Sequence, residues 1–391
     1  METTEKKQLS FFEAAMLVTG SGLGTGILAV PYLVSRLGII QTILTIGVAC
    51  GVSILLHLMV ADLALRSSDS LQLLGIFQQH LFRGRWKKAG TMTFFCIMLV
   101  MLLLNLSLYT VCAAEVLVDI TGLPESVNKV IFYLIASAVV ALGIKSIGIS
   151  EKISMILIGI TVAALGMITL SQNTSMLPFS SGSFPVVLAL YSISMFSFSA
   201  LFSVPQVVTY MKGRSPSRIR RVVVTGIASN AVLTFFFAMI VSMSGSEITA
   251  VATIGLSAKY GQTVQILCAI FVILAMLTSF LSIAFAQMEI LEEKTRMPVW
   301  VSWLLATLPV AVSSLLLPIR FLDYIELVGG VFAIIVVLMV LPAYRNAVKS
   351  VSRSSADDEL MLGRGGRSKI VLFGVLSAYM VMAAASFISI A

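Results

Sequence analysis

The sequence predicts an all-α integral membrane protein with eleven transmembrane helices. Its 391 residues are 58% hydrophobic and only 11% charged, whereas a soluble domain carries about 25% charged residues. The charges also leave long gaps between them, and a membrane-spanning helix needs about 20 apolar residues. The longest gap, 153–211, holds two spans around the polar, proline-bearing segment 171–183. A single membrane domain, 1–391, therefore fills the chain.

The expected helices follow from these charge-free gaps. The shortest gap, 130–144, reaches span length by including Val127 and Asn128 and by letting the Lys129 side chain snorkel to the interface. The eleven helices cover about 11–35, 38–64, 89–118, 126–144, 150–170, 184–211, 219–243, 262–290, 298–317, 323–344 and 370–391. The segment 66–88, with Trp86 and basic residues, predicts an amphipathic helix in the membrane interface.

Lys and Arg in the loops predict the orientation. With the N-terminus inside, 22 of the 26 Lys and Arg residues face the cytoplasm, and this excess on one side is the usual topology signal. The four that remain outside are Arg36, Lys129, Lys259 and Arg320. We expect a multi-pass protein of the cell membrane with its C-terminus outside. The net charge of +8 is spread over short loops, which argues against a nucleic-acid partner.

Four glycines alternate with other residues in the first expected helix, at Gly20, Gly22, Gly24 and Gly26. Each costs a helix about 1 kcal/mol relative to alanine, so the pattern predicts a break near the middle of the bilayer. Unwound backbone is tolerated there only where it lines a cavity. The second half-helix would offer N–H groups and a positive dipole end to an anion. The alternative is a close-packing face for another helix.

The sixth expected helix carries a second set of helix-breaking residues. Its serines compete for the backbone, and Pro205 suits the first turn of a restarted helix. These serines are Ser192, Ser194, Ser197, Ser199 and Ser203. The alternative is a serine-bonded, proline-kinked span without a ligand.

The two predicted breaks lie five helices apart. Because five is odd, the first helix runs outward and the sixth runs inward, so that 11–170 and 184–344 would form inverted repeats, with 370–391 as an extra helix. A broken helix at the same place in each repeat is the sequence pointer to the binding site of a secondary transporter.

Three motifs resemble those of a known family. The motifs are GSGLGTGILAVPY at 20–32, SMFSFSALFSVPQVVTYMKG at 194–213 and TSFL at 278–281. They are similar to the first, sixth and eighth helices of the amino acid/auxin permeases and the hydroxy/aromatic amino acid permeases. These belong to the amino acid–polyamine–organocation superfamily, whose fold is the LeuT-like 5+5 inverted repeat. The chain lacks the histidine that many aromatic amino acid permeases have in the sixth helix, and it has Gly20 where the glutamine-transporter branch has an asparagine. The resemblance therefore does not assign an aromatic substrate.

The resemblance implies a site for an α-amino acid between the two breaks. The substrate carboxylate would meet backbone N–H groups of Gly22, Gly24, Thr25 and Gly26, and the ammonium would face the carbonyl end of the sixth helix near Phe196, Ser197 and Ser199. Tyr109, with Asn105 and Ser107, would close over the substrate. Ordinary packing is the alternative role for Tyr109.

The resemblance also implies a Na⁺ site between the first and eighth helices. Ala275, Thr278 and Ser279 have the required spacing, because i, i+3 and i+4 lie on one helix face. The carbonyls of Gly20 and Leu23 would complete five uncharged oxygens. Alternatively, the two hydroxyls bond back to their own helix. Na⁺ is favoured over H⁺ because the middle parts of the first, fifth, sixth and eighth helices contain no Lys, Asp, Glu or His.

A few other ionisable residues are candidates for secondary roles. His57, inside the second helix with Asp62, is a possible proton site or a satisfied buried imidazole. Glu115 lies near the outer end of the third helix, Asp323 and Glu326 are expected at an extracellular gate, and His80 is expected to be structural.

A secondary active transporter is thus the expected function. An enzyme would need convergent titratable groups or metal ligands at this depth, which the sequence does not show. We expect an importer of an amino acid that works by symport and alternating access, with no cofactor apart from the possible Na⁺ coupling ion. The alternatives are an uncoupled exchanger or facilitator and a membrane nutrient sensor sharing the fold.

Overall fold

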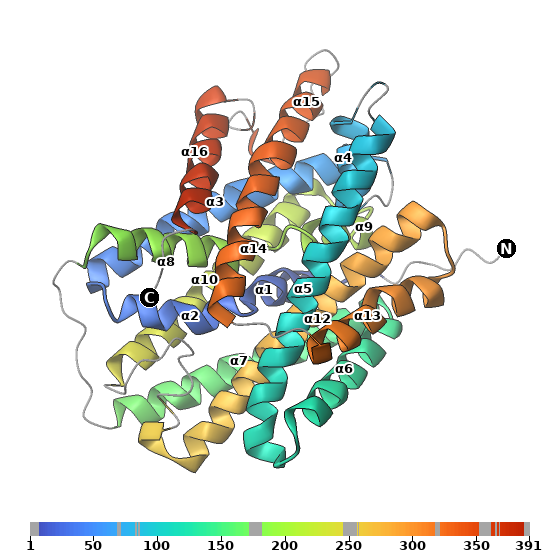
Figure 1. Cartoon of the computed structure of the whole chain (residues 1–391). Helices are drawn as coiled ribbons and strands as arrows, with labels where there is room; N and C mark the ends of the chain where they lie inside the picture. Colours follow the sequence, from blue (N-terminus) through green and yellow to red (C-terminus); the bar gives the residue numbers. More distant parts are fainter. Residues whose placement is uncertain are drawn as a thin grey trace.

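The computed structural model is built of helices throughout the residues it describes (Figure 1). The described residues are 8–68, 72–82, 84, 87–171, 182–244, 256, 258–316, 321–351, 361–363, 366 and 368–386. Side chains at 119, 321–327 and 350–351 are not described.

The first transmembrane segment is broken, as the glycine pattern predicts. It consists of α1 (Phe11–Leu23) and α2 (Gly26–Val34), which are bent by 62° at the break. Ser10 begins α1 with a capping box in which its side chain and that of Glu13 each accept from the other's backbone N–H. Gly24 ends α1 at φ 25°, in a region that favours glycine.

The sixth transmembrane segment is broken too. It consists of α8 (Phe184–Ser197) and α9 (Ser203–Tyr210), separated by residues 198–202. Pro205 stands in the first turn of α9, where its missing N–H removes no helical hydrogen bond.

A helix covers each of the other expected spans. These are α3 (Ile39–Leu65), α5 (Lys87–Thr121), α6 (Glu125–Ala141), α7 (Ile144–Leu170), α10 (Pro216–Met243), α12 (Gln262–Thr295), α13 (Val299–Leu316), α14 (Phe321–Ile335) continued by η2 (Val336–Val340) and α15 (Leu341–Val351), and α16 (Lys369–Ala385). Seven described helices are long and apolar enough to cross a membrane, and the bent α1–α2 pair makes an eighth. The expected spans at α6, α8–α9 and α16 are shorter helices.

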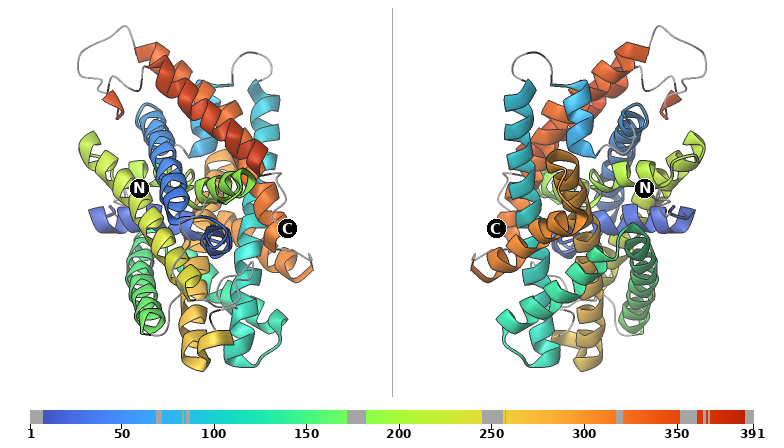
Figure 2. Two further views of the ribbon diagram at one scale, coloured as in Figure 1. Left: turned by 90° about the vertical axis from the view of Figure 1, so that its left-hand side faces the viewer. Right: turned by 90° about the vertical axis from the view of Figure 1, so that its right-hand side faces the viewer.

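The broken first segment lies inside the bundle. α1 packs against α10, α12 and α7, and α2 packs against α8 and α10. Figures 1 and 2 show the dark blue α1 and α2 crossing the centre of the molecule among longer helices. The backbone at the α1–α2 break is therefore enclosed by protein, which is the condition for unwound backbone at membrane depth.

The segment after α3 contains a short helix whose apolar side faces the protein. α4 (Leu73–His80) buries its apolar side chains inside the protein, against α5, α12 and α15. Phe77 is fully buried and stacks edge to face on Phe94 of α5. α3 also contacts α4, so four helices surround it. Its position in the membrane interface stays a prediction, and Trp86 lies outside the described residues.

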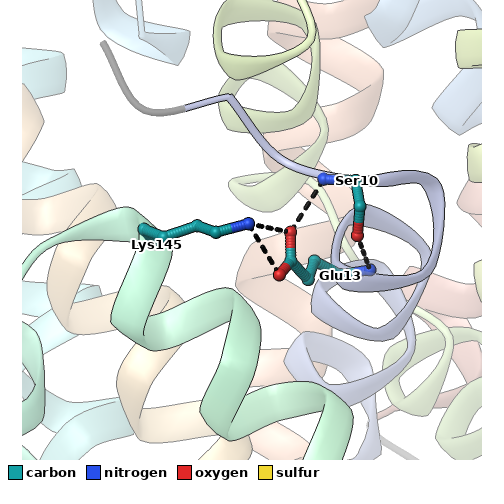
Figure 3. A network of polar contacts seen from close by, with 3 residues as sticks. All are labelled: Ser10, Glu13 and Lys145. Carbon is teal, nitrogen blue, oxygen red and sulfur yellow. Dashed lines mark hydrogen bonds and ion pairs between the residues drawn. The ribbon is translucent and has the colours of Figure 1, made fainter. Parts of the chain in front are cut away.

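A buried ion pair fixes the N-terminal half of the broken helix. Lys145, in the first turn of α7, reaches both carboxylate oxygens of Glu13 at 2.7 Å (Figure 3). The side chain of Glu13 is only 6% exposed, while that of Lys145 is 35% exposed. Leu9, just before α1, also donates its N–H to the carbonyl of Tyr210 at the end of α9. The beginning of α1 is thus tied to α7 and α9.

We predict that Glu13→Gln lowers the free energy of unfolding by about 1–3 kcal/mol. The expected loss lies between the small contribution of a surface pair and the larger one of a fully buried pair, because one partner is partly exposed. Thermal unfolding of the purified protein in detergent measures it. Glu125→Gln, which removes the more exposed pair with Lys129 on α6, is the matched control and should cost less than about 1 kcal/mol. Equal losses in the two variants would contradict the prediction.

Candidate functional site

The two helix breaks enclose a small cavity of about 30 Å³. This volume holds about two water molecules. Eight of the nine residues expected to bind substrate line it, namely Gly22, Gly24, Thr25, Gly26, Asn105, Tyr109, Phe196 and Ser199. The ninth, Ser197, lies beside the cavity, where its Cα and Cβ come close to Gly26.

The backbone at the first break is only partly free for a ligand. Gly24 donates its N–H to the Ser279 hydroxyl of α12 at 2.8 Å, and Gly22 lies within α1. We expected both N–H groups to hold the substrate carboxylate, but in this arrangement the first is bonded to α12 and the second belongs to a helical turn. The groups that remain are those of Thr25 and Gly26, where α2 begins with N–H groups that have no helical partner.

The glycines also allow close packing, so both interpretations of their spacing apply. A Cβ on Gly22 would lie 2.6 Å from the carbonyl oxygen of Ser197, and one on Gly26 would lie 2.8 Å from the Cβ of the same serine. The carbonyl end of α8 therefore approaches the start of α2 at the distance that glycine alone permits. This approach places one negative and one positive helix end at the same cavity.

His57 of α3 holds the second break in place. Its Nε2 accepts the Ala200 N–H at 2.8 Å, and its Nδ1 lies 2.6 Å from the Ser53 carbonyl oxygen. An N–H donor on one side and a carbonyl on the other fix the neutral tautomer with the proton on Nδ1. The imidazole is fully buried with both nitrogens bonded, so the structural role, and not the proton site, describes His57.

Asn230 of α10 joins the two breaks, and the sequence analysis did not identify it. Its side-chain amide donates to the Ser197 carbonyl at 2.8 Å and to the Thr19 carbonyl at 3.3 Å. Thr234, one turn later, donates to its amide oxygen. An asparagine in the middle of an apolar span is a signal in itself, because polar groups in a membrane are expensive unless they have a role.

Several polar atoms around the cavity have no partner in the described structure. They are Thr25 Oγ1, Asn105 Oδ1 and Ser203 Oγ on the cavity wall and Ser197 Oγ beside it. Buried polar groups are nearly always paired, so these oxygens are available to bind water or a polar ligand.

α1 and α12, the two helices expected to hold Na⁺, are in contact at residues implied as ion ligands. The Ser279 hydroxyl donates to the Gly20 carbonyl at 2.8 Å, across the α1–α12 contact. The Thr278 hydroxyl bonds back to the Ala275 carbonyl of its own helix at 3.0 Å. Leu23, the last residue of α1, has a carbonyl without a helical partner. Four of the five expected oxygens thus stand in two hydrogen-bonded pairs.

Comparison with known proteins assigns the family. The sequence profile of the tryptophan/tyrosine permease family matches residues 7–383, nearly the whole chain. The protein belongs to the tryptophan/tyrosine permease family. Glutamine transporter 2 of Aliivibrio fischeri (strain ATCC 700601 / ES114) is 24% identical over 293 residues, which are 70% of this chain and 73% of that protein.

Two solved structures show the same fold. Mhp1, a nucleobase-cation-symport-1 family transporter in a closed conformation with bromovinylhydantoin bound, has a TM-score of 0.67 at 12% identity, covering 97% of this chain and 91% of its own. MhsT in complex with L-phenylalanine has a TM-score of 0.63 at 18% identity, covering 97% of this chain and 100% of its own. The LeuT-like fold expected from the sequence is confirmed.

The sequence analysis did not identify one buried acidic residue of this permease. The middle of α7 holds no Lys, Asp, Glu or His, as expected, but Glu151, in the third turn of α7, is fully buried, and its carboxyl group reaches Gly20 of α1. Neither carboxyl oxygen has a hydrogen-bond partner among the described residues. The sequence placed Glu151 at the cytoplasmic end of a helix starting at about 150, whereas α7 starts at Ile144 and carries it two turns inward.

The other ionisable candidates lie away from the cavity. Asp62 accepts the Met361 N–H at 3.0 Å and ties α3 to the segment before α16. His80 contacts the Ser67 hydroxyl at 3.0 Å through Nε2, and Glu115 is exposed. Asp323 and Glu326 lie in α14, but their side chains are outside the described residues.

Tyr109→Phe tests the closure of the site. The hydroxyl of Tyr109 lies over Gly24 and beside Ser279, and Tyr109 lines the cavity. Losing one hydrogen bond costs about 0.5–1.5 kcal/mol, so substrate affinity should fall about 2- to 10-fold. Equilibrium binding of a labelled substrate measures this. Tyr133→Phe, a buried tyrosine of α6 outside the cavity wall, is the control and should bind as the wild type does.

His57→Leu distinguishes a structural histidine from a proton carrier. The variant leaves the Ala200 N–H unpaired inside the membrane, which should lower the free energy of unfolding by about 1–3 kcal/mol. The pH dependence of uptake should keep its wild-type shape. A stable variant with a shifted pH profile would instead restore the proton role.

Proposed function

We propose that this permease is a secondary active importer of a neutral amino acid, coupled by symport to Na⁺ and working by alternating access. The observation that carries the proposal is the meeting of two broken helices at one cavity, with the carbonyl end of α8 facing the start of α2. We further propose the cell membrane as its location, with the N-terminus inside and the C-terminus outside, from the distribution of Lys and Arg.

An α-amino acid matches the two helix ends. Its carboxylate suits the N–H groups of Thr25 and Gly26 at the positive end of α2, and its ammonium suits the carbonyl end of α8 near Ser197 and Ser199. The unpaired oxygens of Thr25, Asn105 and Ser203 offer further hydrogen bonds to a polar ligand. A nucleobase, which lacks paired opposite charges, would use this dipolar arrangement less fully.

The rest of the cavity wall favours an uncharged side chain. No charged residue is among those that line the cavity in the described structure. The rest of the wall is mainly apolar. It consists of Phe196, Leu201 and Phe202 at the second break, Met101 of α5, Ile283 of α12, and Val328 and Phe332 of α14. A charged substrate side chain would lose its hydration here without gaining a counter-ion. The glutamine named for the Aliivibrio relative and the phenylalanine bound to MhsT are both uncharged in their side chains.

The small cavity volume supports alternating access. About 30 Å³ does not accommodate an amino acid, so the surrounding helices must move to admit one. On the side where α1 begins, Lys145 and the Tyr210 carbonyl tie that helix down. Release of these ties would free the first half of the broken segment, which makes α1 the natural moving part.

Uptake into proteoliposomes tests the proposal. Purified protein is reconstituted and given labelled neutral amino acids under an imposed Na⁺ gradient, an imposed H⁺ gradient or neither. We expect concentrative uptake with the inward Na⁺ gradient and none in protein-free vesicles. Uptake that only equilibrates the label, or requires an amino acid inside, would point to a facilitator or an exchanger. Uptake driven by H⁺ alone would overturn the sodium coupling.

A further inference from the structure

Glu151 is a buried carboxyl group that the proposed function leaves unused. It lies on α7, which packs against both α1 and α12. The residue is 0% exposed, and neither oxygen finds a hydrogen-bond partner among the described residues.

The carboxyl group points at the expected ion site. A Cβ built on Gly20 would meet Glu151 Oε2 first and the Cβ of Thr278 next, at 2.9 Å. The side chains of α7 and α12 therefore converge over the same glycine of α1. Gly20 and Thr278 are two of the five residues implied as ion ligands, so the carboxyl group stands at the edge of that set.

A purely structural role for Glu151 is energetically expensive. A polar group buried without a hydrogen bond is costly, and an uncompensated buried charge is far more costly. An apolar residue of similar size would fill the space without this cost. The unsatisfied carboxyl group is therefore best explained by a positive ligand that compensates it, because the described structure supplies no cationic side chain there.

We propose that Glu151 is a direct ligand of the coupling cation and supplies the negative charge of a site otherwise made of neutral oxygens. The inference rests on the proposed sodium coupling and adds to it a ligand from α7. Carboxylate oxygens are favourable ligands for hard cations, and one carboxylate balances the charge of one Na⁺. The site then joins three helices instead of two.

Through Glu151, the bound ion would connect α7 to α1, the helix that we propose moves during transport. With Na⁺ bound, Glu151 on α7 and Gly20 on α1 share one ion, while Ser279 holds the same stretch of α1 to α12. When the ion leaves, the carboxylate loses its counter-ion, so it must either take up a proton or be exposed to water by a rearrangement of the helices. Ion release and the movement of α1 away from α7 are thereby coupled.

The test compares Glu151→Gln with the wild type at constant pH. Gln has nearly the same shape but no charge, and it removes none of the hydrogen bonds described here. The apparent affinity for Na⁺ is read from the Na⁺ dependence of substrate binding and, independently of substrate, from the rise in thermal unfolding temperature as NaCl replaces choline chloride. Loss of a residue that merely supports a metal ligand costs about 10- to 100-fold in metal affinity, so Glu151→Gln should weaken Na⁺ by about 10-fold or more.

Two further variants keep the result interpretable. Glu115→Gln neutralises an exposed carboxyl group of α5 and should leave the Na⁺ affinity unchanged. Glu151→Asp keeps the charge and should bind Na⁺ more tightly than Glu151→Gln does. Without Na⁺, Glu151→Gln should unfold at the wild-type temperature or higher, because an uncompensated carboxyl group is gone.

Each outcome separates this inference from the function on which it rests. If the wild type responds to Na⁺ and Glu151→Gln responds at the same concentrations, the ligand assignment is overturned and sodium coupling stands. If wild-type binding and unfolding are both indifferent to Na⁺, the sodium coupling fails and the assignment fails with it. Loss of Na⁺ response in Glu151→Gln, with the response kept in Glu115→Gln, supports the inference.

Discussion

Two transmembrane segments stop in the middle of the bundle, and the backbone groups released there must find partners within the protein, because lipid offers none. The surrounding side chains meet much of this demand. His57 accepts from the Ala200 N–H, Asn230 donates to the Ser197 carbonyl, and Ser279 accepts from the Gly24 N–H. The groups left over face one cavity, and this cavity is where we propose that the substrate binds.

Ser279 shows how closely the two expected sites are connected. Its hydroxyl accepts from the Gly24 N–H, at the edge of the cavity, and donates to the Gly20 carbonyl, at the expected ion site. One side chain of α12 therefore bridges both ends of the glycine run. Any ligand that changes the position of this run at one site changes the other, and such coupling acts equally in both directions.

The glycines serve packing and function together. Gly22 and Gly26 bring α8 within a distance that a methyl group would prevent, and Gly20 does the same for α7 and α12. Because polar backbone atoms of α1, α2 and α8 then lie next to one another, close packing is itself what assembles the site. The sequence left two alternatives for the glycine run, a helix break and a close-packing face. In the structure both are present at the same residues.

The sequence by itself determined the spans, the two breaks and eight of the 17 residues that line the cavity. These depend on local properties: the length of apolar stretches, the low helical stability of alternating glycines, and the tendency of serine and proline to interrupt a helix. The five-helix interval between the breaks was enough to indicate the fold, since it sets the order of inverted repeats.

Only the tertiary structure decided which faces of the helices meet. It placed Asn230 between the breaks, covered the apolar face of α4, and brought Glu151 against Gly20. Each of these depends on the rotation and depth of a helix relative to its neighbours, which the hydropathy of a span leaves open because lipid-facing and protein-facing residues are equally apolar. The start of α7 at Ile144, rather than at about 150, is the decisive case. That shift moves the carboxyl group of Glu151 from the expected membrane surface into the protein interior. There it lies against Gly20 of α1 without a hydrogen-bond partner among the described residues.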